Sequence, residues 1–159
     1  MEIRRFRSED AAEVTGCIVQ LQNYERTIDE RVLPGEAVED WYLDYLVKTC
    51  AEQDGGLFVA EVGGRVVGFA AVQRRVTNDD VDESEYHFAL ISDLGVNESH
   101  RGQGIGRALI AACEAFARRR DVRWLRIAVL GQNELARGLY ERCGFTDRQV
   151  VLEKSLSGD

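Results

Sequence analysis

This sequence has few of the residues that build metal sites or crosslinks. Its 159 residues include two histidines, four cysteines and one proline. His87 and His100 are far from the cysteines, and no two cysteines form a CxxC pair, so the clustered ligands that zinc requires are missing. We therefore expect no metal, and we expect buried, reduced thiols with no nucleophilic role.

Positive charge is also in deficit. Lys and Arg total 20 against 28 Asp and Glu, which gives a formal net charge of −8. A generic nucleic-acid binder carries a basic surface, so this balance argues against one, although it is compatible with a cationic substrate. Long apolar runs of membrane-spanning or signal-peptide type are absent too. We expect a cytoplasmic protein with no membrane association, made of a single domain over residues 1–159.

The elements expected from hydrophobic periodicity follow the order β-α-α-β-β-β-α-β-α-β. The expected strands are residues 1–7, 57–62, 65–74, 86–96, 123–130 and 149–156. Ser8 can cap the first helix. The second helix, which carries Tyr42 and Leu46 on one side, follows the break at Pro34-Gly35. The Gly63-Gly64 link predicts a hairpin, and residues 77–85 form an acidic loop.

The richest segment is residues 91–107, ISDLGVNESHRGQGIGR, where a strand enters a glycine-rich turn that opens a helix. Free amides and the dipole at a helix N-terminus attract phosphate, and glycines let the backbone approach a ligand closely. The turn is no Walker loop, because no Gly-Lys-Ser/Thr follows, and its alternating glycines do not meet the dinucleotide spacing. A flexible tight turn without a ligand is the alternative reading of this segment alone.

Two motifs together resemble the GNAT family of N-acetyltransferases. The stretch from Arg101 to Gly106, RGQGIG, matches the Q/R-x-x-G-x-G/A signature of that family. Downstream, residues 133–145 are similar to its N-x-x-A-x-x-L-Y-x-x-x-G-F segment, with Asn133, Ala136 and Tyr140 in place. The element order also matches along nearly the whole chain. The resemblance implies an α/β (α+β) chain of the GNAT acyl-CoA N-acyltransferase fold, with a mixed central sheet splayed between its fourth and fifth strands and flanked by helices.

The resemblance further implies acetyl-CoA as co-substrate. Its pantetheine arm would pair with the fourth strand where the sheet splays, and a bulge is expected there, which Gly95 would tolerate. The implied cofactor-binding residues are Leu94, Gly95, Val96, Arg101, Gly102, Gln103, Gly104, Ile105, Gly106, Arg107, Asn133, Ala136 and Tyr140. Asn133 is also expected to cap its helix.

The resemblance assigns Tyr140 as the general acid that protonates the leaving thiolate. Asp93 is a candidate general base. Some similar polyamine acetyltransferases carry a Glu where this chain has Ser92, so this chain lacks that second candidate. Glu85 and His87, at the start of the same strand, stay open as alternatives, as do Tyr24, Glu25 and a water chain. We expect Tyr24, Glu25 and Glu85 to contribute to the substrate wall.

The expected reaction moves the acetyl group of acetyl-CoA directly to a primary amine on a small molecule or a peptide. Two alternatives stay open. One is an acyltransferase acting on protein lysine or N-terminal amines, or using another acyl group. The other is a non-catalytic acyl-CoA-binding sensor or interaction module, against which the proton donor Tyr140 argues. Dimers are frequent among similar proteins, so a homodimer is one expectation.

Overall fold

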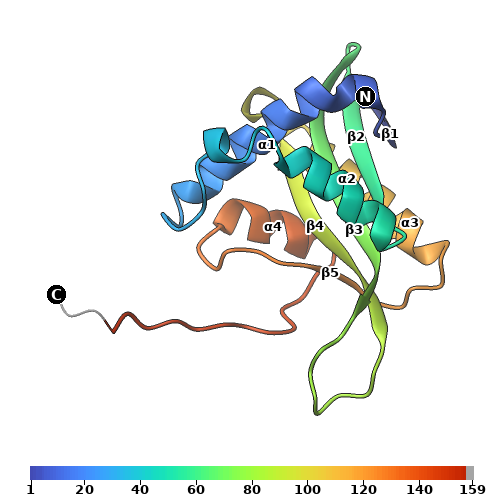
Figure 1. The fold of residues 1–159 in the computed structure, drawn as a ribbon, viewed down its shortest axis with the longest axis vertical. Helices are drawn as coiled ribbons and strands as arrows, with labels where there is room; N and C mark the ends of the chain where they lie inside the picture. Colours follow the sequence, from blue (N-terminus) through green and yellow to red (C-terminus); the bar gives the residue numbers. More distant parts are fainter. Residues whose placement is uncertain (157–159) are drawn as a thin grey trace.

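The computed structural model describes residues 1–156 and places a five-stranded sheet between helices on both faces (Figure 1). The strands are β1 (Glu2–Arg5), β2 (Gly56–Val62), β3 (Arg65–Thr77), β4 (His87–Val96) and β5 (Leu125–Ile127). The α-helices are α1 (Ala11–Arg26), α2 (Tyr42–Glu52), α3 (Ile105–Arg118) and α4 (Glu134–Arg142). Three short 3-10 turns cover Ser8–Asp10, Gly35–Ala37 and Glu98–His100. The expected order is confirmed up to α4.

The sheet is mixed and splayed, as expected. Strands β1 to β4 pair antiparallel in sequence order, and the Gly63-Gly64 turn between β2 and β3 takes positive φ at both residues. β5 then pairs parallel with β4 over three residues only, from Ala89–Leu125 to Ile91–Ile127. Beyond Ile91, β4 continues to Val96, and no other strand among residues 1–156 pairs with it on that side. The two strands therefore part at the middle of β4.

Two apolar clusters fill the two faces of the sheet. One lies under α1 and α2, where Val14, Ile18 and Leu46 meet Phe69 of β3. The other lies under α3, whose Leu109 and Phe116 pack with side chains from β2, β3 and β4. Leu139 and Tyr140 of α4 also pack against this second cluster. The sheet thus separates an α1/α2 layer from an α3/α4 layer.

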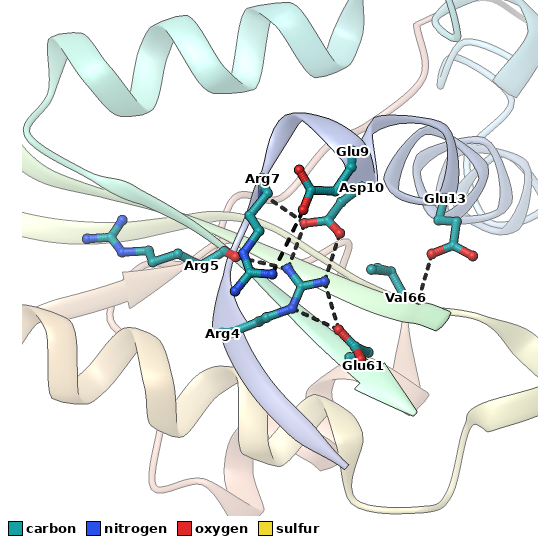
Figure 2. A network of polar contacts seen from close by, with 8 residues as sticks. All are labelled: Arg4, Arg5, Arg7, Glu9, Asp10, Glu13, Glu61 and Val66. Carbon is teal, nitrogen blue, oxygen red and sulfur yellow. Dashed lines mark hydrogen bonds and ion pairs between the residues drawn. The ribbon is translucent and has the colours of Figure 1, made fainter. Parts of the chain in front are cut away.

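A buried ion pair fixes the start of the chain (Figure 2). Asp10 accepts hydrogen bonds of 2.7 and 2.8 Å from the guanidinium of Arg4, and Arg4 Nε donates to Glu61 at 2.8 Å. Asp10 also accepts from the amide of Arg7 at 2.7 Å. The prediction that Ser8 caps the first helix is wrong, because the carboxylate that satisfies a free amide here comes from Asp10, two residues later.

The last expected strand is wrong. Residues 149–156 form no strand, and the C-terminal segment runs away from the body of the molecule (Figure 1). Strand propensity yields a strand only where a neighbouring backbone offers hydrogen bonds, and the segment pairs with none of the strands that the structure describes. The fifth strand is likewise shorter than expected, three residues in place of residues 123–130.

The cysteines are free, as expected: Cys17, Cys50 and Cys113 are buried and Cys143 is half-buried. In the part of the chain that the structure describes, no helix is long and apolar enough to span a bilayer. Within that same part, no group of three or more His, Cys, Asp or Glu side chains is arranged to hold a metal ion.

Candidate active site

The glycine-rich turn leads directly into α3 and leaves a row of free amides. Gly102 and Gly104 take φ of +74° and +82°, values that residues with a Cβ rarely adopt. Among residues 1–156, no carbonyl or side chain accepts from the amides of residues 102–107; the first helical bond is Ala108 N to Gly104 O, at 3.0 Å. A Cβ at Gly102 or Gly104 would meet no atom within 4 Å, so the space above them is open. This is the geometry of an anion site.

Gly106 has a different role from its two neighbours. A Cβ there would come within 2.9 Å of Leu139 Cδ2. The absence of a side chain therefore lets α3 approach α4, and Gly106 offers a ligand only its amide. Ile105 is similar, because its side chain is buried in the α3-side cluster.

Tyr24 of α1 contacts both the glycine-rich turn and the start of α4. The guanidinium of Arg101 lies 4.9 Å from the centre of the Tyr24 ring, within the range of a cation–π contact. The Tyr24 hydroxyl lies 3.5 Å from Asn133 Oδ1. That same oxygen accepts from Ala136 N at 3.1 Å, so the predicted helix cap is confirmed. Tyr24 thus contacts two predicted cofactor residues, whereas sequence reasoning placed it on the substrate wall.

A bulge in β4 reverses the face of the sheet to which the following side chains point. Ile91 pairs with Val72 and Asp93 pairs with Ala71, so Ser92 is an extra residue with no partner on β3. Since side chains alternate between faces, the extra residue moves Asp93 from the face of Ile91 to the opposite one. Asp93 therefore faces the α1/α2 layer.

The predicted place of this bulge is wrong. Gly95 pairs in register with Phe69. A Cβ at Gly95 would come within 2.7 Å of the Phe69 ring, so its lack of a side chain makes room for that ring. Leu94 and Val96 pack against the α3-side cluster, while the outer edge of this part of β4 has no partner strand in the described part of the chain.

A pocket of about 230 Å³ opens where β4 and β5 part. Its lining comes from α1 (Leu21, Gln22, Glu25), α2 (Tyr42), β4 (Ser92, Asp93, Leu94), the end of β5 and the residues after it (Ile127, Ala128, Leu130) and α4 (Tyr140). Two carboxylates and two phenols therefore share one small space. The candidate acid and the candidate base meet here although they are far apart in sequence.

The pKa values of both carboxyl groups in the pocket, Asp93 and Glu25, are raised above their ordinary values. Burial raises the pKa of Asp93, while the neighbouring Ser92 hydroxyl and the hydrogen bond from Tyr42 to the carboxylate oppose that rise. Burial also raises the pKa of Glu25, and the nearby charge of Asp93 raises it further. The site therefore favours one shared positive charge, such as that of an ammonium group.

The two phenols hold their protons firmly. Burial, together with the charges of Glu25 and Asp93, raises the pKa of Tyr140 to about 12. Burial and the neighbouring Asp93 also raise the pKa of Tyr42. The Tyr42 hydroxyl donates to Asp93 Oδ1 at 2.9 Å. Tyr140 is therefore protonated throughout the neutral range, as a proton donor must be.

The structure separates some of the predicted residues from the pocket. Glu85 and His87 are exposed at the far end of β4, where His87 Nδ1 lies 3.0 Å from the Thr77 hydroxyl. Neither lines the pocket. Sequence reasoning missed Tyr42 as a site residue, because its helical spacing with Leu46 is equally typical of a core aromatic. Only the fold shows that its hydroxyl reaches Asp93.

Comparison with known proteins gives a consistent result. A family model described as "Acetyltransferase (GNAT) family" matches residues 18–145. An uncharacterised N-acetyltransferase of Methanocaldococcus jannaschii is 34% identical over 70% of this chain, and the match spans 46% of that relative, less than half its length. An aminoglycoside N(6')-acetyltransferase type 1 of Stenotrophomonas maltophilia is 30% identical over 69% of this chain and 72% of its own.

A solved structure agrees on the fold. It is an aminoglycoside N-acetyltransferase in complex with CoA, with a TM-score of 0.67 and 18% identity, covering 98% of this chain and 100% of that one. At this identity the likeness concerns the arrangement of the backbone. The superposition extends over nearly the whole of both chains.

Proposed function

Because the chain belongs to the acetyltransferase (GNAT) family, we propose that it transfers the acetyl group of acetyl-CoA directly to a primary amine. The observation that carries the proposal is the meeting of Asp93 and Tyr140 in one pocket, at the point where the sheet parts. A buried carboxylate and a protonated phenol on either side of a reaction centre suit a proton acceptor and a proton donor.

The residues suit two parts of acetyl-CoA, its diphosphate and its pantetheine arm. The free amides of residues 102–107, with the charges of Arg101 and Arg107, suit the diphosphate. The outer edge of β4 between Ser92 and Val96 offers backbone groups to the pantetheine arm, in the manner of an added strand. When bound, acetyl-CoA supplies the activated thioester and a thiol leaving group.

Asp93 is proposed as the group that removes a proton from the substrate ammonium. Its raised pKa makes it a stronger base than an ordinary carboxylate, which narrows the gap to the pKa of an amine. Glu25, beside it, would hold the positive charge before the proton leaves. Tyr140 Oη is proposed to give its proton to the leaving sulfur, because a phenol with a pKa of about 12 is protonated at neutral pH.

The proposed acceptor is a small-molecule amine that carries a positive charge. Two carboxylates in a pocket of about 230 Å³ favour a cation over a neutral or acidic group. The relatives named as aminoglycoside acetyltransferases support an acceptor of this class. A lysine side chain or a peptide N-terminus is the second candidate, because the pocket itself needs only a terminal ammonium.

An amine panel tests the proposal. Polyamines, aminoglycosides, a lysine peptide and a free N-terminal peptide are each incubated with acetyl-CoA, and the released thiol is measured. We expect turnover with at least one cationic amine, and we expect Asp93→Asn to lose it while acetyl-CoA still raises the melting temperature. Binding of acetyl-CoA without thiol release from any amine would contradict the enzyme and favour an acyl-CoA sensor. No shift in melting temperature would contradict the cofactor site.

A further inference from the structure

A second pocket, of about 180 Å³, lies where the end of β1 meets the end of α2 and the start of β2. Most of its wall is apolar and comes from Phe6, Val47, Cys50, Ala51 and Leu57. Within residues 1–156, Arg5 is the one charged residue that lines it. It shares no lining residue with the candidate active site, so it is a separate place on the molecule.

The guanidinium of Arg5 adjoins this pocket. Arg5 Nη1 donates a hydrogen bond to the carbonyl of Gly55 at 3.5 Å. A Cβ at Gly56 would come within 2.0 Å of the same nitrogen. Both glycines line the pocket. The lack of a side chain at Gly56 therefore lets the cation lie against the backbone at the pocket wall.

A second guanidinium contacts the same aromatic ring as that of Arg5. The guanidinium carbon of Arg5 lies 4.7 Å from the centre of the Phe116 ring, and that of Arg120 lies 3.8 Å from it. Two positive charges are thus brought together around one ring. Burial and the charge of Arg120 lower the pKa of Arg5, in keeping with this crowding. An oxyanion beside both groups would relieve their repulsion and accept hydrogen bonds from them.

No carboxylate of the described residues neutralises these two cations. Arg4 pairs with Asp10 at 2.7 Å, whereas Arg5 points away from that carboxylate (Figure 2). Within residues 1–156, neither Arg5 nor Arg120 takes part in an ion pair. The dipole of α3 favours a cation after its C-terminus, which accounts for Arg120 but not for Arg5 of β1. In a chain of net charge −8, the pair is therefore available to an anionic ligand.

We propose that this pocket binds a small organic acid. Its carboxylate would lie between the guanidinium groups of Arg5 and Arg120, and its apolar body would fill the space against α2. Guanidinium groups match the planar, two-oxygen geometry of a carboxylate, and a mostly apolar wall suits a carbon chain. A neutral or cationic ligand would leave both positive charges unmatched. The site lies apart from the proposed active site, and the proposal does not depend on acetyl transfer.

Titration calorimetry with hexanoate is the first test. We expect the natural chain to bind it with a dissociation constant below about 1 mM. Arg5→Gln and Arg120→Gln each remove one charge, so each should weaken binding at least about tenfold. Arg7→Gln and Arg118→Gln are the matched controls, because each of these exposed arginines pairs with a glutamate of its own. No binding, or equal binding by the natural chain and both charge variants, would overturn the proposal.

Filling the pocket tests its apolar part. Ala51 is exposed on α2 and lines the pocket, so a larger side chain there occupies the space without disturbing the core. Ala51→Phe should weaken hexanoate binding at least about tenfold. Ala12→Phe is the control, at an exposed alanine of α1 outside the pocket, and should bind as the natural chain does. Hexylamine and inorganic phosphate are the ligand controls, and each should bind at least about tenfold more weakly than hexanoate.

Amide chemical shifts on the same samples locate the ligand and show that each variant is folded. We expect hexanoate to shift the signals of residues 5–6, 47–57 and 116–120. Shifts confined to residues 102–107 would overturn the proposal, because the acid would then bind at the glycine-rich turn. Equal affinity for hexylamine or for phosphate would also overturn it, since the site would then select neither charge nor an apolar body. These measurements use no acetyl-CoA and no acceptor amine, so a failure of the proposed activity would leave them unchanged.

Discussion

Tyr42 Oη lies 2.9 Å from Asp93 Oδ1 and donates a hydrogen bond to it, so α2 sets the chemistry of a carboxylate on β4. A hydrogen bond to the charged form of an acid lowers its pKa, whereas burial raises it. At Asp93, burial raises the pKa more than the neighbouring Ser92 hydroxyl and the Tyr42 hydrogen bond lower it. The phenol thus keeps the carboxylate available as a base.

Removing that hydroxyl should therefore shift the pH dependence of the proposed reaction. In Tyr42→Phe the carboxylate loses a donor, its pKa rises further, and the acidic limb of kcat/KM should move to higher pH by about one unit. Tyr45→Phe is the matched control, because Tyr45 lies on the same helix, is half exposed and does not line the pocket. Superimposable profiles for Tyr42→Phe and the natural chain would show that Asp93 is not the titrating base.

Tyr140→Phe should slow the chemical step more than it weakens cofactor binding. The phenol is protonated at neutral pH, and the loss of a general acid costs roughly 10²- to 10⁴-fold in rate. The measurements are kcat with an amine found in the panel and the dissociation constant of CoA by calorimetry. If kcat stays within about twofold of the natural value, the proton comes from another group.

Gly104→Ala should weaken CoA binding through the backbone. A Cβ at a φ of +82° costs about 1–2 kcal/mol, and the turn would relax away from the conformation that aims its amides outward. Gly131→Ala is the control, because Gly131 is exposed, has no positive φ, and its Cβ would meet nothing within 4 Å. Calorimetry should show at least about tenfold weaker binding for Gly104→Ala alone. Equal affinities would mean that the phosphates bind elsewhere.

Asp10→Asn should lower the stability of the fold at neutral pH. Its hydrogen bonds with Arg4 keep the pKa of Asp10 below the value of 3.8 taken for the unfolded chain. The stabilisation is therefore complete at neutral pH and is lost as the pH falls below about 3.8, through the lowered pKa. We expect a loss on the order of 3 kcal/mol in urea unfolding at pH 7, because Arg4 keeps its contact with Glu61.

The control for this change is Glu9→Gln, which neutralises the exposed neighbouring carboxylate. It should alter the free energy of unfolding by less than about 0.5 kcal/mol. At a pH below the lowered pKa of Asp10, the natural chain and Asp10→Asn should unfold with similar free energies. A constant difference at every pH would attribute the effect to packing and not to the ion pair.

Features encoded by neighbouring residues could be predicted from the sequence. The turn at Gly102–Gly104, the Gly63-Gly64 hairpin and the Asn133 cap each depend on a few adjacent residues, so the sequence alone predicts them. The sequence predicts the pocket only in part. Tyr140 and Asp93 came from the family resemblance, but the approach of Glu25 and Tyr42 depends on how α1 and α2 pack over the sheet. The segment 149–156 has strand propensity, yet propensity alone does not provide the neighbouring strand that pairing requires.

The bulge at Ser92 makes the pairing of β4 as important as its composition. Ile91 and Asp93 have the same parity, so if β4 paired with β3 without a bulge, the carboxylate would face α3, among the buried side chains of that layer. A change that straightened the strand would thus keep every side chain and still move the proposed base to the wrong side of the sheet. Among relatives of this chain, a bulge at this place in the strand would therefore be a stronger sign of the same reaction than the carboxylate alone.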